Sequence, residues 1–362
     1  MRIGIDARVL AGTPTGVARY LSALIEHLPT SVKREDVLEL FADRPLPSGT
    51  PATVLRWPLP GGDPAWRQFR LGAHLIRPRV DVLFCPFYTI PLVARVPTVV
   101  VIHDVSFAAR PEWFSAKARV AFALVGPSAR RARRIITVSE FSAGEIVRRL
   151  GVRRERIHVI PPGLDPRWLR PVVAEERRAA REWLGFAGPY ALHLGAVTAR
   201  RNLDLVVRAF SRVMLEARLV VVGPAVPPAP DVDELAREGG IADRVIRRAW
   251  AQETILRGLL AEAAVLVYLS EYEGFGLPAL EALAVGTPVL ALRRASLPEV
   301  LGEVAAWVET EDPGEIGAQL DGLMRGGPMA GRLAREGPHR AALFDPYVAA
   351  ERTWNVVRDA AR

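Results

Sequence analysis

Two glutamates, Glu273 and Glu281, stand on either side of a Gly-Phe-Gly-Leu-Pro run and could converge on one ligand. On a single helix, side chains eight residues apart would diverge by roughly 80°. Pro278 favours the first turn of a helix, which leaves Glu273 in the preceding loop and places Glu281 inside the helix. The glycines of the run let the backbone approach a ligand and aim its amides at an anion. The alternative is a solvated acidic pair beside a glycine turn.

Two adjacent arginines, Arg200 and Arg201, are the second feature that could do chemistry. They lie in a turn that begins at Gly195, between a strand expected at 190–194 and a helix expected at 203–213. Guanidinium groups at such a turn could clamp a diphosphate and stabilise the charge of the leaving group as a glycosidic bond breaks. The alternative is a basic, solvated loop.

The first half of the chain offers two further candidates. A strand expected at 2–5 leads into a glycine loop that ends at Gly16, where a helix begins. This loop lacks the three spaced glycines of the dinucleotide fingerprint, so the sequence does not favour NAD. His103 and Asp104 end the strand expected at 98–102, and open α/β sheets bind ligands at the carboxyl ends of their strands. A structural role is the alternative for both.

The elements that must position these residues alternate between strand and helix in both halves. Continuous Val, Ile and Leu runs predict strands covered on both faces, as in doubly wound parallel sheets. The expected strands are 2–5, 37–41, 53–57, 82–85, 98–102, 134–138 and 157–160, then 190–194, 218–222, 244–247, 265–268, 288–292 and 305–308. The main helices expected in the first half are 16–27, 112–132 and 143–150.

A Pro-Pro-Gly segment at 161–166 can continue neither a strand nor a helix and therefore predicts a domain boundary. We expect one domain at 1–165 and a second at 166–345, which suits a chain of 362 residues. The amphipathic helix expected at 346–362 is predicted to pack back on the first domain.

The stretch around the two glutamates, from Tyr272 to Gly286-Thr287-Pro288, resembles the paired-glutamate motif of family four of the retaining glycosyltransferases. Further matched elements follow one another in order from Asp6 to the turn at 344–347. The resemblance implies the GT-B fold, in which two Rossmann-like domains face each other across a cleft. It also implies that the first domain binds the acceptor and the second binds the donor.

The resemblance assigns expected roles to particular residues. Glu273 approaches the hydroxyls of the donor sugar, Glu281 binds the nucleotide ribose, and Arg200 and Arg201 hold the diphosphate. Arg201 stands where the family commonly has lysine. The other implied donor-binding residues are Gly16, Gly195, Trp250, Phe275, Gly276 and Leu277. His103 and Asp104, which resemble the pattern of mannosyltransferase-like members, are expected to contact the sugar or the acceptor.

The expected reaction is the retaining transfer of a hexose from a nucleotide diphosphate sugar, with a GDP-mannose-like donor preferred, to a saccharide or lipid-linked acceptor. The expected setting is bacterial cell-surface polysaccharide or glycolipid synthesis, with no metal ion and no other cofactor. No side chain is an obvious covalent nucleophile, so front-face attack assisted by the leaving phosphate is the expected mechanism. The alternatives are a non-catalytic nucleotide-sugar-binding or scaffold protein and a GT-B nucleotide-sugar epimerase.

Composition narrows the expected partners. The formal charge is +8, and only two residues, Lys33 and Lys117, are lysines. Arginine, alanine, glycine and proline are abundant, as in GC-rich bacterial genomes, but anionic substrates or anionic lipid would also suit this charge. No nucleic-acid-binding motif is present. The start of the chain lacks a signal peptide, and no apolar run reaches the ~20 residues that span a bilayer. We expect a cytoplasmic protein with peripheral membrane contact as an option; oligomeric state is left open.

Overall fold

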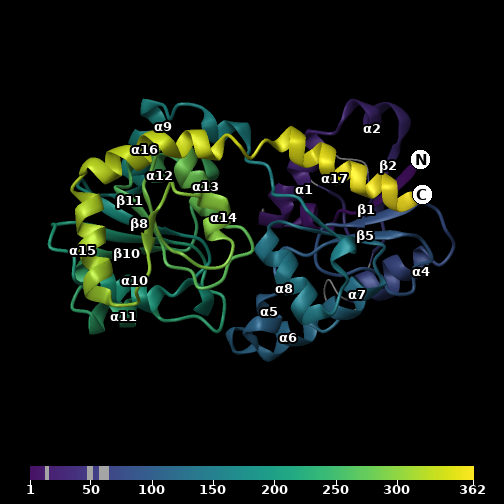
Figure 1. Cartoon of the computed structure of the whole chain (residues 1–362), viewed down its shortest axis with the longest axis horizontal. Helices are drawn as coiled ribbons and strands as arrows, with labels where there is room; N and C mark the ends of the chain where they lie inside the picture. The colour runs from purple at the N-terminus through teal and green to yellow at the C-terminus, as the bar shows by residue number, and fades with distance from the viewer. Residues whose placement is uncertain (13–15, 47–51, 57–64) are drawn as a thin grey trace. The chain divides into compact units, whose positions relative to one another are not determined.

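The computed structural model describes residues 1–12, 16–46, 52–56 and 65–362 of the chain (Figure 1). The chain divides into two compact units. Unit 1 comprises residues 1–111, 116–163 and 344–362, and unit 2 comprises residues 112–115 and 164–343. Residues 13–15, before Gly16, and residue 57, the last of the strand expected at 53–57, lie outside the described residues. The observed strand ends at Val54, so that expectation was too long by at least residues 55 and 56.

Unit 1 is built on a parallel sheet whose strand order is β3-β2-β1-β4-β5-β6-β7. Its strands are β1 (Arg2–Asp6), β2 (Val37–Ala42), β3 (Thr53–Val54), β4 (Val82–Cys85), β5 (Thr98–Val101), β6 (Arg134–Thr137) and β7 (Ile157–Val159). The apolar runs of the sequence correctly predict these strands, because both faces of the sheet are covered and leave no solvated side to alternate.

The helices of unit 1 pack on both faces of this sheet. They are α1 (Gly16–Glu26), α2 (Thr30–Glu35), α4 (Gly72–His74), α5 (Ser106–Ala109), α6 (Ala116–Phe122), α7 (Val125–Arg131), α8 (Glu140–Leu150) and α17 (Pro346–Ala361). Helices α1, α2 and α17 share one core with the sheet, whereas α7 and α8 share another on the opposite face. The last helix thus packs within unit 1 (Figure 1), where Trp354 donates from Nε1 to the Leu24 carbonyl at 3.0 Å.

The single helix expected at 112–132 is wrong. The structure has a short turn at Pro111–Trp113 followed by two helices, α6 and α7. Pro127 explains the break, because proline has no amide hydrogen and its ring clashes with the carbonyl four residues earlier. The chain accommodates Pro127 by starting α7 at Val125, which places the proline in the first turn.

Unit 2 contains a second parallel sheet, with the strand order β10-β9-β8-β11-β12-β13. Its strands are β8 (Tyr190–Leu194), β9 (Arg218–Val222), β10 (Val245–Arg248), β11 (Val265–Tyr268), β12 (Val289–Leu292) and β13 (Ala306–Val308). Its helices are α9 (Ala174–Leu184), α10 (Leu203–Phe210), α11 (Val232–Glu238), α12 (Glu253–Glu262), α13 (Leu277–Ala284), α14 (Leu297–Leu301), α15 (Pro313–Met324) and α16 (Pro328–Ala341). Helices α10, α11 and α15 share one core with the sheet (Figure 1). Both units are therefore doubly wound, as the sequence predicts.

Each sheet reverses its strand order once. In unit 2 the chain runs outward from β8 to β10 and then returns to place β11 on the other side of β8. In unit 1 the same reversal separates β1 from β4. Loops that leave the sheet on either side of such a reversal diverge and open a crevice at the carboxyl ends of the strands. The topology therefore selects the loops after β8 and β11, and those after β1 and β4, as candidate ligand sites.

Candidate active site

In unit 2 the reversal lies between the two loops that the sequence singles out. Strands β8 and β11 are hydrogen-bonded neighbours, with Val265 opposite Ala191 and Leu266 opposite Leu192. The loop after β8 carries Arg200 and Arg201, and the loop after β11 carries Glu273. The backbone amide of Glu271 donates to the Arg200 carbonyl at 2.9 Å and joins the two loops directly.

The first loop is shaped to bury Arg201. Gly195 has φ +122°, and a Cβ built there would lie 2.5 Å from Nη1 of Arg201, so any side chain at 195 would displace the guanidinium. Arg201 ends a 3-10 turn (Ala199–Arg201), and Asn202 has φ +53° before α10 begins. Arg201 is 7% exposed, and its Nη1 donates to the Leu194 carbonyl at 3.0 Å.

The second loop places the two glutamates as the proline predicts. Glu273 lies in the loop and Glu281 lies on α13, and both side chains are buried. Pro278 stands in the first turn of α13, and Gly276 has φ +102° just before it. The Ser296 hydroxyl stabilises this loop, because it can donate to the carbonyls of Glu273 at 2.9 Å and Phe275 at 3.2 Å.

Arg201, Glu273 and Tyr268 form one buried network. Nε of Arg201 lies 3.2 Å from Oε1 of Glu273, and the Tyr268 hydroxyl donates to the same oxygen at 3.1 Å. The guanidinium also stacks over the Tyr268 ring, with Cζ 4.9 Å from the ring centre. Two donors on one oxygen fix the rotation of the carboxylate and orient Oε2.

Two buried side chains at this network, Tyr268 and His193, are neutral. Burial raises the pKa of the Tyr268 phenol, so its hydroxyl keeps its proton and remains a donor. Burial, helped by the charge of Arg201, lowers the pKa of His193 on β8 to about 3, so this imidazole is neutral at physiological pH. Arg201 and Glu273 therefore face each other as opposite charges between two neutral side chains.

The sequence did not single out Tyr268. The available signal was its position: it is the last residue of a buried strand, and a phenol there needs a polar partner in the loop that follows. Five residues separate it from Glu273, which is within reach of a strand-to-loop turn.

The structure places the other predicted donor residues in several ways. Phe275 and Gly276 are buried, Leu277 is half-buried at the start of α13, and Arg200 is half-buried beside Arg201. Trp250 follows β10, an edge strand separated from β8 by β9, and its side chain is 64% exposed. Trp250 thus lies at the carboxyl ends of the strands, as Arg201 does, but two strands away from it.

In unit 1 a charged pair that the sequence missed lies at the end of β1, next to the strand reversal. Asp6 ends β1 and is fully buried, and Nε of Arg67 donates to its Oδ2 at 2.5 Å. Nη1 of Arg67 also donates to the Thr89 hydroxyl at 2.6 Å, in the loop after β4. Arg67 belongs to a π-helical turn (Trp66–Leu71), a conformation often found at functional sites. The signal for it was Asp6 itself, since a buried carboxylate at a strand end requires a cation.

His103 lies at the carboxyl end of β5, as expected. Its Nε2 is 3.0 Å from the Pro86 carbonyl, which can only accept, so this nitrogen carries the proton and Nδ1 is the acceptor. Burial lowers the pKa of His103, which keeps the ring neutral near pH 7. The rings of Tyr20 and Tyr88 pack edge-on against it.

Asp104 and Gly16 are placed differently from His103. Oδ1 of Asp104 accepts from both the amide and the hydroxyl of Ser106, at 2.9 and 2.7 Å, and so supports the first turn of α5. Gly16 is the exposed first residue of α1. Ser139, after β6, caps α8, because its hydroxyl accepts from the Ser142 amide.

The part of the chain that the structure describes contains neither a metal-binding cluster nor a membrane-spanning helix. No cluster of three or more His, Cys, Asp or Glu side chains has the arrangement of a metal site there. No helix there has both the length and the apolar surface required to cross a bilayer.

Comparisons with known proteins identify the family of the chain. The family model described as "Glycosyltransferase Family 4" matches residues 14–168, and that described as "Glycosyl transferases group 1" matches residues 188–325. The chain is 33% identical over 247 residues to an MMP alpha-(1->4)-mannosyltransferase of Mycolicibacterium hassiacum, which covers 66% of this chain and 57% of that protein. It is 31% identical over 225 residues to the O-antigen chain mannosyltransferase B of Escherichia coli, covering 60% and 58%.

The fold also matches solved structures. Anabaena HepE, solved in complex with UDP and glucose, superposes with a TM-score of 0.78 at 20% identity and covers 99% of this chain and all of that chain. The sequence matches span about half the length of the curated relatives. The two family models match most of both halves of the chain, including Gly16 and the loops after β5, β8 and β11 that carry candidate residues. The chain belongs to family four of the glycosyltransferases and has the GT-B fold.

Proposed function

We propose that the protein is a retaining glycosyltransferase that moves a hexose from a nucleotide diphosphate sugar to a saccharide or lipid-linked acceptor. The observation that carries the proposal is the buried Arg201–Glu273–Tyr268 network at the strand reversal of unit 2. A carboxylate fixed through one oxygen offers the other to sugar hydroxyls. The adjoining guanidinium groups supply positive charge for a diphosphate.

In the proposed reaction the bond between the anomeric carbon and the diphosphate oxygen breaks as the acceptor hydroxyl forms a new bond on the same face of the sugar. The acceptor proton passes to an oxygen of the departing phosphate. Arg200 and Arg201 stabilise the charge that develops on the diphosphate, while Glu273 orients the sugar and Glu281 binds the ribose. The loop backbone at 275–277, together with Gly16 and Gly195, approaches the phosphates and sugar, and Trp250 stacks on the base. The proposed reaction uses no metal ion.

Arg201 has two tasks in this proposal. Its Nε and Nη1 are already engaged with Glu273 and Leu194. It therefore acts on the diphosphate mainly as a fixed positive charge, and Arg200, half-buried beside it, is the second proposed diphosphate contact. The arginine fork, in place of the usual lysine, holds the carboxylate and the carbonyl through two separate nitrogens, Nε and Nη1.

Mannose is the proposed sugar, supported by the two relatives that are named mannosyltransferases. GDP is proposed as the nucleotide from the mannosyltransferase-like pattern around His103. Neutral His103, with Nδ1 as an acceptor, is proposed to contact a hydroxyl of the sugar or acceptor. Asp104 supports that loop through Ser106, which gives it a positioning task beside any contact of its own.

Cell-surface polysaccharide or glycolipid synthesis is the proposed setting, and the O-antigen relative supports it. We propose a cytoplasmic protein with peripheral contact at the membrane, because a lipid-linked acceptor would be held at a membrane surface.

Thermal stabilisation by a panel of nucleotide sugars, followed by assays of nucleotide diphosphate release, tests the proposal. We expect one donor to raise the melting temperature. This donor should be consumed in the presence of acceptor and hydrolysed only slowly in its absence. Glu273→Gln should abolish turnover. A donor that binds without being consumed would instead favour a non-catalytic binding or scaffold protein. Conversion to another nucleotide sugar without release of nucleotide diphosphate would favour an epimerase.

A further inference from the structure

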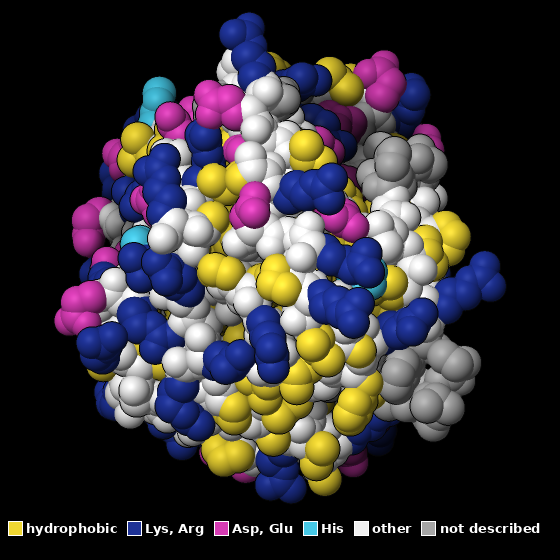
Figure 2. Space-filling model, turned by 90° about the vertical axis from the view of Figure 1, so that its right-hand side faces the viewer, with side chains coloured by type: hydrophobic (Ala, Val, Ile, Leu, Met, Phe, Trp, Pro, Cys, Tyr) yellow, Lys and Arg dark blue, Asp and Glu magenta, His cyan; other side chains and the backbone are white. Residues whose placement is uncertain are grey.

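The amino ends of the strands in unit 1 form a basic edge, which we call the amino edge. It lies a full strand length from the loops of the candidate site, because all strands of the sheet are parallel. Figure 1 shows the start of β1, marked N, at the right-hand side, and Figure 2 looks onto that side. Dark blue Lys and Arg side chains predominate there over acidic ones, and a group of hydrophobic side chains lies among them.

A hollow of about 490 Å³ lies on this edge, before β5 and β6. Three of its lining residues are arginines: Arg95 precedes β5, and Arg131 and Arg133 precede β6. The other lining residues are Ala94, Val96, Pro97 and Thr98, so no acid faces the arginines across the described lining. Strands β5 and β6 are neighbours in the sheet, which holds the three residues close together.

The backbone around the hollow is fixed. The Arg133 amide donates to the Thr98 carbonyl at 2.9 Å, and the Arg95 amide donates to the Leu75 carbonyl at 3.3 Å. Nη2 of Arg131 donates to the Ala94 carbonyl at 3.0 Å, which anchors one guanidinium on the rim. No ion pair engages any of the three arginines within the described portion of the chain, and their side chains are exposed.

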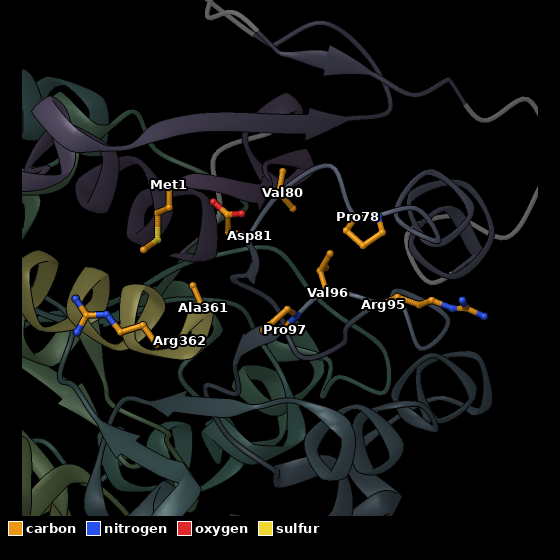
Figure 3. Close-up of a pocket in the computed structure, with 9 residues that line it drawn as sticks. All are labelled: Met1, Pro78, Val80, Asp81, Arg95, Val96, Pro97, Ala361 and Arg362. Carbon is orange, nitrogen blue, oxygen red and sulfur yellow. The ribbon is translucent and has the colours of Figure 1, made fainter.

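A second hollow adjoins the first and shares Arg95, Val96 and Pro97 with it (Figure 3). In that view the Arg95 and Arg362 side chains extend in opposite directions, and Asp81 lies near Met1 rather than near the Arg95 guanidinium. Oδ2 of Asp81 accepts from the Arg2 amide at 2.7 Å. Asp81, the one acidic side chain among the lining residues of the second hollow, is therefore turned away from the Arg95 guanidinium.

The electrostatic surroundings agree with this picture. Burial lowers the pKa of His74, at one end of the amino edge; Arg79 and Arg70 lower it further, whereas Glu39 raises it. Burial also lowers the pKa of Arg156, before β7 at the other end, and Arg153 and Arg134 lower it further. Positive charge thus acts on groups at both ends of the edge and not only at the hollow.

We propose that the amino-edge hollow binds a phosphoryl group, of a lipid headgroup or of a free phosphorylated molecule, through Arg95, Arg131 and Arg133. A planar guanidinium matches the geometry of phosphate oxygens through paired N–H bonds, and three such groups suit an anion with more than one charge. Val93 and Ile76, 53% and 45% exposed, flank this part of the edge and provide apolar contact for whatever carries the phosphate.

The test uses the full chain and two probes. Inorganic pyrophosphate, titrated by calorimetry, represents a free phosphate, and phosphatidylcholine vesicles with and without phosphatidylglycerol represent a headgroup. The variant Arg131→Ala/Arg133→Ala is compared with Arg237→Ala/Arg335→Ala, which removes the same charge from exposed positions in unit 2. Because the candidate donor site could also take pyrophosphate, the titrations are repeated on an Arg201→Ala background.

We expect the wild type to bind at least one probe and the Arg131→Ala/Arg133→Ala variant to bind it about thirtyfold more weakly, at about 1 kcal/mol per arginine. The control variant should bind as the wild type does. Loss confined to pyrophosphate assigns the site to a free phosphate, and loss confined to phosphatidylglycerol vesicles assigns it to a headgroup. Binding of neither probe, or equal losses in both variants, would overturn the inference. Stabilisation by donor should be unchanged in the variant, so failure here is distinguishable from failure of the proposed function.

Discussion

Replacement of Tyr268 by phenylalanine is the most specific perturbation of the candidate site, because it removes one oxygen atom. The ring remains to stack under Arg201, while Glu273 loses the donor at 3.1 Å from its Oε1. Hydrogen bonds to charged groups contribute about 1.5–3 kcal/mol. Glu273 is 5% exposed, so water has little access to replace the lost donor. We expect the free energy of unfolding to fall by about 2 kcal/mol.

The effect on turnover should exceed that of lost stability alone. With one donor left on Oε1, the carboxylate can rotate about the remaining bond to Arg201, and Oε2 is no longer held in one place. Misplacement of a positioning group by about 1 Å can lower rates by about a hundredfold. We therefore expect kcat/KM for the donor to fall between tenfold and a hundredfold, with kcat affected as well as KM.

Tyr190 provides a matched control in the same sheet. It stands on β8, and its hydroxyl donates to the Leu259 carbonyl at 2.6 Å, away from Glu273. Tyr190→Phe removes a buried bond to a neutral acceptor and should cost about 1 kcal/mol. Chemical denaturation measures the stability of both variants, and nucleotide diphosphate release measures their turnover, at a temperature where both are folded.

Full kcat/KM in Tyr268→Phe would refute the reasoning, as would equal fractional losses in Tyr268→Phe and Tyr190→Phe. Either result would mean that the hydroxyl only fills the core of unit 2 and that Arg201 alone orients Glu273.

Three further predictions concern the same network. Gly195→Ala should lower kcat/KM because its Cβ would lie 2.5 Å from Nη1 of Arg201. The control Gly185→Ala, at φ +73° with open space around it, should lower stability only by the backbone strain of about 1–3 kcal/mol. Equal activity in the two variants would contradict this prediction. Arg201→Lys keeps the charge but not the fork, so we expect about tenfold lower kcat/KM and a larger loss in Arg201→Ala, and identical rates in the two would remove the role of charge. Because the pKa of His193 is about 3 in the folded protein and near 6.5 when unfolded, its contribution to stability is complete above pH 6.5 and is lost as pH falls. In His193→Asn, the slope of the unfolding free energy against pH should therefore be smaller by about 1.4 kcal/mol per pH unit between pH 6 and 4. An unchanged slope would show that His193 is protonated in the folded protein over this range.

The sequence predicts the sheets better than the helices, for a physical reason. Strands buried on both faces are continuous apolar runs, and Tyr190–Leu194, Arg218–Val222 and Val265–Tyr268 were expected with their observed bounds. The helix expected at 112–132 failed because its pattern was read through Pro127, whose missing amide hydrogen decides the break.

The candidate site could be predicted only as far as local rules reach. Pro278 and the glycines before it were enough to place Glu273 in a loop and Glu281 on a helix. Contacts such as Arg67 with Asp6, 61 residues apart, depend on how the chain folds over the sheet. A solvated Arg201 was one alternative that the sequence left open. The structure instead buries Arg201, because the absence of a side chain at Gly195 leaves room for the guanidinium.

The burial of Arg201 and Glu273 carries an argument about how the site works. Removing either partner of a buried ion pair typically costs about 3–5 kcal/mol, since the other charge is left uncompensated. The residues that fix this pair, namely Gly195, Tyr268 and Ser296, all belong to unit 2. The orientation of Glu273 is thus set within unit 2 before any ligand or acceptor arrives. Changes in this network should consequently lower donor affinity, whereas changes at His103 should not. If His103→Ala lost donor affinity as strongly as Tyr268→Phe does, the sugar would be held by unit 1 instead.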